Sequence, residues 1–204
     1  FFRNPTNRGA VYSGDGGATL LIGDLTPDGN GNCPVVALDG NIPDPVAFAQ
    51  VQADPNCFSF QETITGGFTP RFGGDSSDMS FLLGLRGEIN DNLRWDVSAY
   101  LGEHEADFFI NNTVNASLGP DTPRDFDPGL YKQTDTNFNA DLSWTVSDTL
   151  NIGFGGEFRN EEFEIGPGQV ESYTAGPLAD QGFSTSSNGF PGFPAATSGT
   201  YERE

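Results

Sequence analysis

The feature of this sequence that most restricts its fold is a regular alternation of apolar and polar residues over four long stretches. From Met79 to Ile89 the odd positions are apolar or glycine, and the odd positions from Leu93 to Leu101 are apolar as well. The pattern returns at 138–146 and 150–158, where the even positions are apolar or glycine. A period of two is typical of a β-strand with one apolar face.

The connections between these stretches alternate in length. Turn-forming residues at Asn90–Asn92 and Ser147–Asp148 predict two tight hairpins, whereas long polar loops are expected from Asn111 to about Tyr131 and after Gly166. The expected strands run about 14 to 18 residues, against a usual length of about 5 to 6. Long strands with short turns on one side and long loops on the other are typical of outer-membrane barrels. The sequence therefore predicts an all-β fold of long antiparallel hairpins from a transmembrane β-barrel with long extracellular loops.

The apolar face of these hairpins is expected to contact lipid, and the densely polar opposite face to line a water-filled or plugged lumen. Trp95 and Trp144 lie close to the tight turns, where an aromatic girdle would meet the membrane interface. The alternative is that both are core tryptophans of a secreted β-sandwich binding module. The predicted membrane-facing residues are Met79, Phe81, Leu83, Leu85, Trp95, Val97, Leu142, Trp144, Ile152 and Phe154.

The composition limits the partners of the chain. A net charge of −20, from 29 acidic and 9 basic residues, repels nucleic acid, so we exclude nucleic acid as a partner. We attribute the charge to solvated loops. No run approaches the roughly 20 apolar residues of a membrane-spanning helix. No leader stands at Phe1, so we expect either a processed chain or an internal fragment.

The two cysteines, Cys33 and Cys57, both lie in Gly-, Pro- and Asp-rich sequence. An isolated pair in such loops predicts a disulfide formed in an oxidising compartment. The alternative is two free thiols, which would be exposed and reactive. Neither cysteine has a histidine or a second cysteine at zinc-ligand spacing.

Two local features stand out in the first quarter of the chain. Asp44 followed by Pro45 predicts the start of a short helix that reaches Val51. Oxygen-bearing side chains at alternate positions, Asp28, Asn30 and Asn32, are similar to the first half of a calcium loop. Because the sixth position is a cysteine, a simple turn is the favoured interpretation and calcium a weak alternative; we expect no other cofactor.

The sequence offers no enzyme active site. The single histidine, His104, lies between two glutamates, and neighbouring strand residues point to opposite faces. No serine or cysteine stands in a recognisable nucleophile motif. We therefore expect a protein that is not an enzyme.

Several segments resemble the TonB-dependent outer-membrane receptors. They are TLLIGDLTPDG at 19–29, NCP at 32–34, ADFFINNTVNASLGP at 106–120 and QGFSTSSNGFPGF at 181–193. The resemblance implies a barrel of about 22 strands with an N-terminal plug. It implies the uptake of a siderophore, a vitamin, a glycan or another bulky solute, driven by an inner-membrane energy-coupling protein.

The resemblance places about four to six strands of such a barrel in this chain, without the plug, the coupling box or the closing strand. Residues 1–77 would be an extracellular loop region with partial strands, 78–165 two hairpins of the barrel wall, and 166–204 a loop leading into the next strand. The implied partners are the rest of the barrel, the plug, lipid and the energy-coupling protein. The implied location is the bacterial outer membrane, with the loops outside.

A barrel segment without its neighbours would behave differently. So few strands cannot close, and open edges pair with other chains. The alternative function is therefore a self-assembling extracellular β fibre, formed by open-edged β assembly or as a cross-β fibril.

Overall fold

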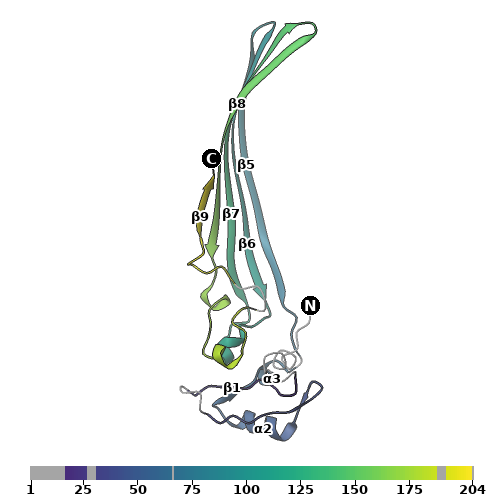
Figure 1. The fold of residues 1–204 in the computed structure, drawn as a ribbon, viewed down its shortest axis with the longest axis vertical. Coiled ribbons are helices and arrows are strands. Elements are labelled where there is room, and N and C mark those ends of the chain that lie inside the picture. The colour runs from purple at the N-terminus through teal and green to yellow at the C-terminus, as the bar shows by residue number, and fades with distance from the viewer. Residues whose placement is uncertain (1–16, 27–30, 66, 188–191, 204) are drawn as a thin grey trace. The chain divides into compact units, whose positions relative to one another are not determined.

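The fold is mostly β and is built on one large antiparallel sheet (Figure 1). The computed structural model describes residues 17–26, 31–65, 67–187 and 192–203. The sheet has five strands in the order β5-β6-β7-β8-β9, which is also their order along the chain. The strands are β5 (Arg71–Asn90), β6 (Leu93–Asn111), β7 (Phe126–Ser147), β8 (Leu150–Pro167) and β9 (Gly199–Arg203).

The two predicted hairpins and both tight turns are confirmed. Strands β5 to β8 contain 20, 19, 22 and 18 residues, so the first three are longer than expected and β8 is at the upper end of the expected range. β5 begins at Arg71, and β7 begins at Phe126 within the expected loop. Strand pairing depends on backbone hydrogen bonds, so strands extend through polar segments that show no alternation.

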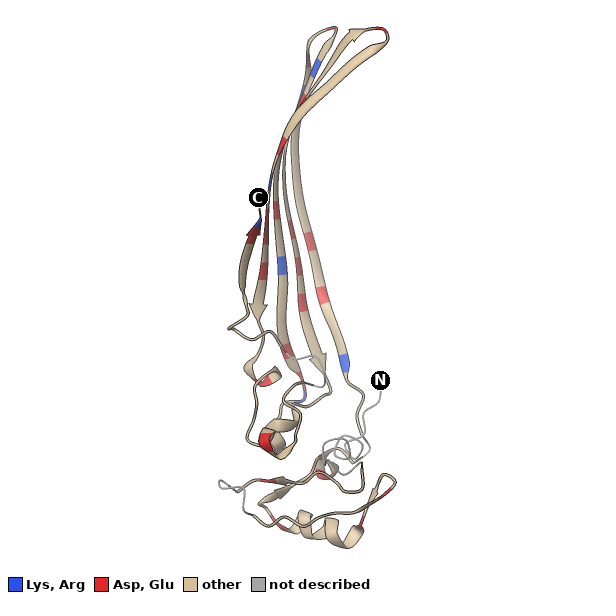
Figure 2. Cartoon of the chain, in the orientation of Figure 1, with Lys and Arg blue, Asp and Glu red and all other residues tan. Residues whose placement is uncertain are grey.

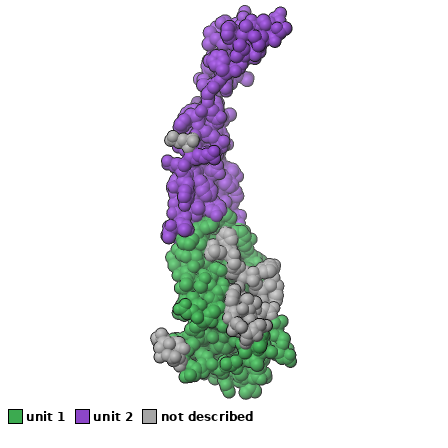
Figure 3. All heavy atoms as spheres, in the orientation of Figure 1, with its two compact units in different colours: residues 1–73, 108–129, 167–194 green, residues 74–107, 130–166, 195–204 purple. Residues whose placement is uncertain are grey.

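The chain divides into two compact units (Figure 3). Unit 1 combines residues 1–73, 108–129 and 167–194, and unit 2 combines 74–107, 130–166 and 195–204. Each unit therefore assembles stretches that are distant in the sequence. The division expected from the sequence, at residues 77 and 165, followed the order of the chain, and its functional assignments remain predictions.

Unit 1 contains short elements between its loops. β1 (Gly23–Asp24) pairs with β4 (Cys57–Phe58), and β2 (Leu38–Asp39) pairs with β3 (Ile42–Pro43). Its helices are α2 (Pro45–Ala53), α3 (Phe60–Thr63) and the 3-10 turns η1 (Ala116–Asp121), η2 (Val170–Ser172) and η3 (Ala179–Gln181). Among the described residues, no helix is long and apolar enough to cross a membrane.

Both α-helices begin at capping residues. The side chain of Asp44 accepts hydrogen bonds from the N–H groups of Val46 and Ala47, which confirms the predicted helix start. Ser59 and Glu62 form a reciprocal capping box at α3. This second helix was not predicted, although its Ser-x-x-Glu spacing is a recognisable signal.

Unit 1 has its own apolar clusters. One contains Leu20, Val36, Val51 and Cys57; a second contains Phe58, Ala116, Leu178 and Phe183; a third contains Ile64, Phe68 and Val114. These side chains come from all three stretches of unit 1. Full burial of one large apolar side chain stabilises the folded state by about 1.5–3 kcal/mol. The clusters therefore hold the three stretches together.

Candidate functional site

The apolar side chains of the two hairpins lie on the surface of unit 2. Phe81 is 63% exposed, Leu83 60% and Trp144 46%, while Trp95 and Leu142 are half-buried. A β-sandwich would bury such residues in its core. The exposed large apolar residues of these strands are Phe72, Met79, Phe81, Leu82, Leu83, Leu85, Ile89, Val97, Leu101, Phe138, Trp144, Val146, Leu150, Ile152, Phe154, Phe158 and Phe163.

Contacts between β5 and β6 show which residues share a face. Nε of Arg94 lies 3.1 Å from Oε1 of Glu88, and Nδ1 of His104 lies 2.7 Å from Oδ1 of Asp78. In both pairs the two residues are equally far from Asp91 along the chain. Gly87 and Trp95 obey the same pairing, because a Cβ added at Gly87 would lie 2.9 Å from Nε1 of Trp95. Odd residues of β5 therefore share a face with odd residues of β6, and both apolar rows lie on that face.

In the second hairpin, residues equally far from Asp148 along the chain lie opposite each other. The rings of Phe138 and Phe158 are 6.4 Å apart, and a Cβ at Gly166 would lie 2.7 Å from Cγ of Leu130. Even residues of β7 therefore share a face with even residues of β8. The apolar positions 138–146 and 150–158 form one surface.

The two hairpins are joined through β6 and β7. The N–H of Thr145 donates to the carbonyl of Asn92 at 2.8 Å, so the tight turns lie at the same end of unit 2 (Figure 1). Farther from the turns, Nζ of Lys132 lies 3.0 Å from Oε2 of Glu103. Glu103 is an odd residue of β6 and Lys132 an even residue of β7, so this ion pair lies on the same face as the apolar rows. Charged residues therefore replace apolar ones on this face at that distance from the turns.

These rows define an apolar band, which we name by its residues 79–89, 93–101, 138–146 and 150–158. Each segment contains about nine to eleven residues, and a transmembrane β-strand needs about 9–11. All four segments end at the tight turns. The strands continue beyond the band with charged and polar residues interspersed with apolar ones such as Phe108, Tyr131 and Phe163.

The opposite face of the sheet is mainly polar, with exposed apolar exceptions such as Leu82 and Phe163. It carries the pairs Glu88–Arg94, Asp78–His104, Asp135–Arg159, Glu161–Arg159 and Asn137–Glu157. Acidic residues are spread along all four long strands (Figure 2). The alternation thus separates an apolar face from a hydrated, charged face.

A depression of about 280 Å³ on unit 2 surrounds His104. Tyr100, Gln133 and Asp135 contribute to its lining. His104 contacts Asp78, whereas its neighbour Glu103 contacts Lys132, so the adjacent side chains diverge as expected for a strand. The arrangement can hydrogen-bond a polar solute.

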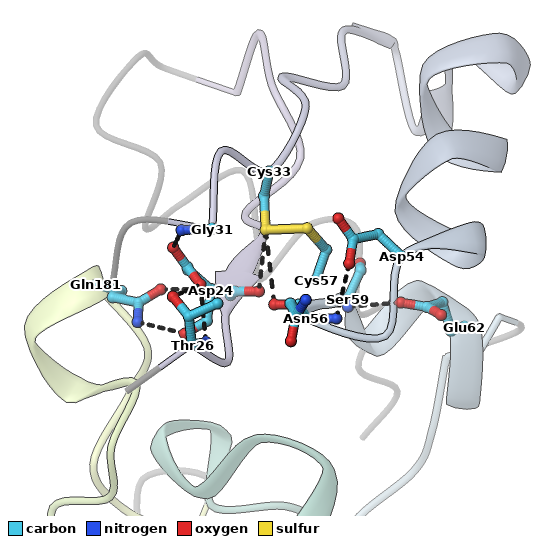
Figure 4. Close-up of a disulfide and its surroundings, with 11 residues drawn as sticks. Asp24, Thr26, Gly31, Cys33, Asp54, Asn56, Cys57, Ser59, Glu62 and Gln181 are labelled. Carbon is cyan, nitrogen blue, oxygen red and sulfur yellow. Dashed lines mark hydrogen bonds between the residues drawn. A yellow bond between two sulfur atoms is a disulfide. The ribbon is translucent and has the colours of Figure 1, made fainter. Parts of the chain in front are cut away.

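The predicted disulfide between Cys33 and Cys57 is confirmed (Figure 4). The sulfur atoms are 2.10 Å apart and the Cα atoms 5.6 Å apart. Cys57 is buried, and Cys33 packs against the same apolar cluster. The bond fixes the segment around β4 to the loop that follows β1.

Asp24 organises that loop (Figure 4). Its carboxylate accepts hydrogen bonds from the hydroxyl and N–H of Thr26 and from the N–H of Gly31. These bonds, first that from the Thr26 hydroxyl, lower the pKa of Asp24 because they stabilise the charged form. The side-chain amide of Gln181 accepts from the N–H of Asp24 and donates to its carbonyl.

The weak calcium prediction falls mostly outside the described residues, since Asp28 and Asn30 are not described. Asn32 has a φ of 54°, a left-handed conformation that asparagine adopts in turns. Among the described residues, no three His, Cys, Asp or Glu side chains form a group able to hold a metal ion.

Comparison of the chain with protein-family models, with curated proteins and with solved structures gave no match. The geometry of the apolar band and of the loop unit therefore carries the functional argument.

Two important residues in unit 1 were not predicted from the sequence. Gln181 contacts Asp24 across 157 positions of the chain. Arg124 lines a cavity with residues of α3 and with Asn112. No local pattern marks either residue, because both act through contacts that are distant in sequence.

Proposed function

We propose that unit 2 forms part of the wall of an outer-membrane β-barrel of the TonB-dependent receptor type. In this proposal the apolar band contacts lipid and the polar face lines the interior. The protein takes part in the uptake of a bulky solute such as a siderophore, a vitamin or a glycan, and it catalyses no reaction. The observation that supports the proposal most directly is the exposed apolar band, one transmembrane strand in length, on four consecutive strands.

The connections support an orientation. Outer-membrane barrels have short periplasmic turns and longer extracellular loops. The tight turns at Asp91 and Asp148 would thus face the periplasm, and segments 112–125 and 168–187 would face outward. A disulfide in unit 1 fits an oxidising, extracellular setting.

The edges of the sheet indicate the implied partners. β5 and β9 are the outermost strands of the described sheet. In a barrel, further strands would pair with both edges, because an open edge exposes unpaired backbone groups. The remaining partners are the plug, lipid and, through the complete receptor, an inner-membrane energy-coupling protein.

Nitroxide scanning of residues 79–89 in lipid vesicles tests the proposal. Single cysteines are introduced in turn, labelled, and measured for collision with oxygen, which concentrates in lipid, and with a water-soluble nickel chelate. We expect oxygen collisions to peak at odd positions and nickel collisions at even positions. Leu82 and Leu83 provide a matched pair within the same strand. Absence of this alternation, or alternation without any lipid dependence, would exclude a membrane wall.

The alternative is a self-assembling extracellular β fibre, and the edge position of the 20-residue strand β5 favours it. A fibre stacks strands about 4.8 Å apart. The −20 charge opposes such stacking, so assembly would need low pH or cations. A fibre reflection near 4.8 Å, from chain that does not insert into vesicles, would favour this alternative.

A further inference from the structure

Unit 1 contains a cavity of about 740 Å³ between helix α3 and the segment that follows β6. Small-molecule sites combine apolar walls, which supply contact area, with placed polar groups, which fix the orientation of the ligand. This cavity is lined by apolar and polar residues in similar number. The apolar lining residues are Phe58, Phe60, Ile64, Val114 and Pro120, and the polar ones are Thr63, Asn112, Thr122, Arg124 and Asp125.

Arg124 is the cation among these lining residues. Its Nη2 donates to Oδ1 of Asn112 at 2.6 Å, and its Cζ lies 5.3 Å from the ring centroid of Phe68. Within the described part of the chain, the guanidinium makes this single hydrogen bond and no ion pair, although it carries five N–H donors. Burial lowers the pKa of Arg124, and the group stays charged at neutral pH.

Asn112 holds the guanidinium in place. The Nδ2 of Asn112 donates to the carbonyl of Thr69 at 2.9 Å, and its N–H donates to Oδ1 of Asp125 at 2.9 Å. Asp125 accepts this backbone hydrogen bond and lies outside ion-pair distance of Arg124, although its negative charge raises the pKa of the guanidinium and partly offsets the effect of burial. The cation is positioned before any ligand arrives, which reduces the entropy cost of binding.

The chemistry of the cavity selects its ligand. An arginine guanidinium matches the two oxygens of a carboxylate, and hydrogen bonds to a charged group are stronger in a partly desolvated site. Phenylalanine walls favour a flat ring. We propose that this cavity binds a small aromatic carboxylate, with the carboxylate on Arg124 and the ring against Phe60 and Ile64.

The proposal goes beyond membrane insertion and does not depend on it. Every lining residue belongs to unit 1, whereas the apolar band belongs to unit 2. Binding can fail while insertion is observed, and the reverse also holds.

Calorimetric titration of the complete chain with naphthalene-1-carboxylate tests the proposal, with naphthalene-1-carboxamide as the uncharged control. We expect saturable one-to-one binding of the acid and at least tenfold weaker binding of the amide. Arg124→Gln should weaken the binding of the acid at least tenfold and leave the binding of the amide unchanged. Arg71→Gln is the matched control, because Arg71 is an exposed arginine of the same unit that does not line the cavity.

A second variant covers the case in which Arg124→Gln does not fold. Thr63 is exposed and lines the cavity, so Thr63→Trp should fill it and abolish binding without removing the guanidinium. Far-UV circular dichroism and the melting curve check the fold of each variant. The proposal is overturned if the acid shows no saturable binding at millimolar concentration, or if the acid and the amide bind equally well. It is also overturned if Arg124→Gln and Arg71→Gln lose the same affinity for the acid, or if folded Thr63→Trp binds the acid as well as wild type.

Discussion

The side-chain amide of Gln181 forms two hydrogen bonds with the backbone of Asp24, accepting from its N–H at 2.7 Å and donating to its carbonyl at 2.9 Å. The two residues are separated by 157 positions. An amide that bonds both the N–H and the carbonyl of Asp24 acts like the backbone of a strand paired with β1. It connects the segment after β8 to the segment around β1 in unit 1.

Replacing Gln181 should loosen this connection. Gln181→Ala removes two partly buried hydrogen bonds, each of which contributes about 0.5–1.5 kcal/mol, so we expect a loss of about 1–3 kcal/mol in the free energy of unfolding. Amide hydrogen exchange of the peptide around Asp24, followed by mass spectrometry, should become faster. Gln133→Ala in unit 2 is the control and should leave that peptide unchanged. Equal exchange in wild type and Gln181→Ala would show that the connection contributes nothing.

The disulfide should stabilise unit 1 substantially. Cys33 and Cys57 are separated by 24 positions, and closure of such a loop in the unfolded chain corresponds to about 3 kcal/mol. We expect the double variant Cys33→Ser/Cys57→Ser to lose about that amount, measured by urea unfolding. Wild type in reducing agent should show a similar loss. An unchanged unfolding midpoint under both conditions would contradict the prediction.

The sequence predicted what depends on local pattern. Period-two alternation identifies the hairpins, because side chains alternate across a strand, and Asp44 followed by Pro45 identifies α2. The start of β7 at Phe126 was not predicted, because Asp127-Pro128-Gly129 is turn-type sequence and the backbone pairing that includes it in the strand carries no sequence signal.

Sequence patterns also did not predict contacts between residues that are distant in the sequence. The buried side chain of Asn115 donates to the carbonyls of Glu171 and Thr174, and it accepts from the hydroxyl of Ser117. Nothing near Asn115 in the sequence indicates these partners. The same reason explains why the cavity beside Arg124 could not be predicted, because its walls come from separate segments.

The hydrogen bonds to Asp24 make part of the stability depend on pH. Because the pKa of Asp24 is lower in the folded protein than its ordinary value of about 3.9, its contribution is complete above that value. The contribution is lost as the pH falls below about 3.9 through the lower folded pKa. Asp24→Asn should flatten this part of the curve of unfolding free energy against pH. Asp39→Asn, in the same unit, serves as the control, and equal flattening by both variants would contradict the assignment to Asp24.

Leu82 and Leu83 allow the membrane proposal to be tested with one residue type. They are adjacent in β5 and similarly exposed, at 67% and 60%, but they lie on opposite faces of the sheet. Leu83→Arg places a charge in the apolar band, which at the middle of a bilayer costs about 2–4 kcal/mol. Leu82→Arg places the same charge on the polar face, where we expect a change below about 0.5 kcal/mol.

Urea-dependent folding into lipid vesicles measures both variants, and the same titration in detergent-free buffer provides the comparison. Only Leu83→Arg should be destabilised, and only in lipid. Equal effects of the two substitutions would indicate that the two faces of β5 meet the same surroundings. That result would exclude lipid on one side and water on the other.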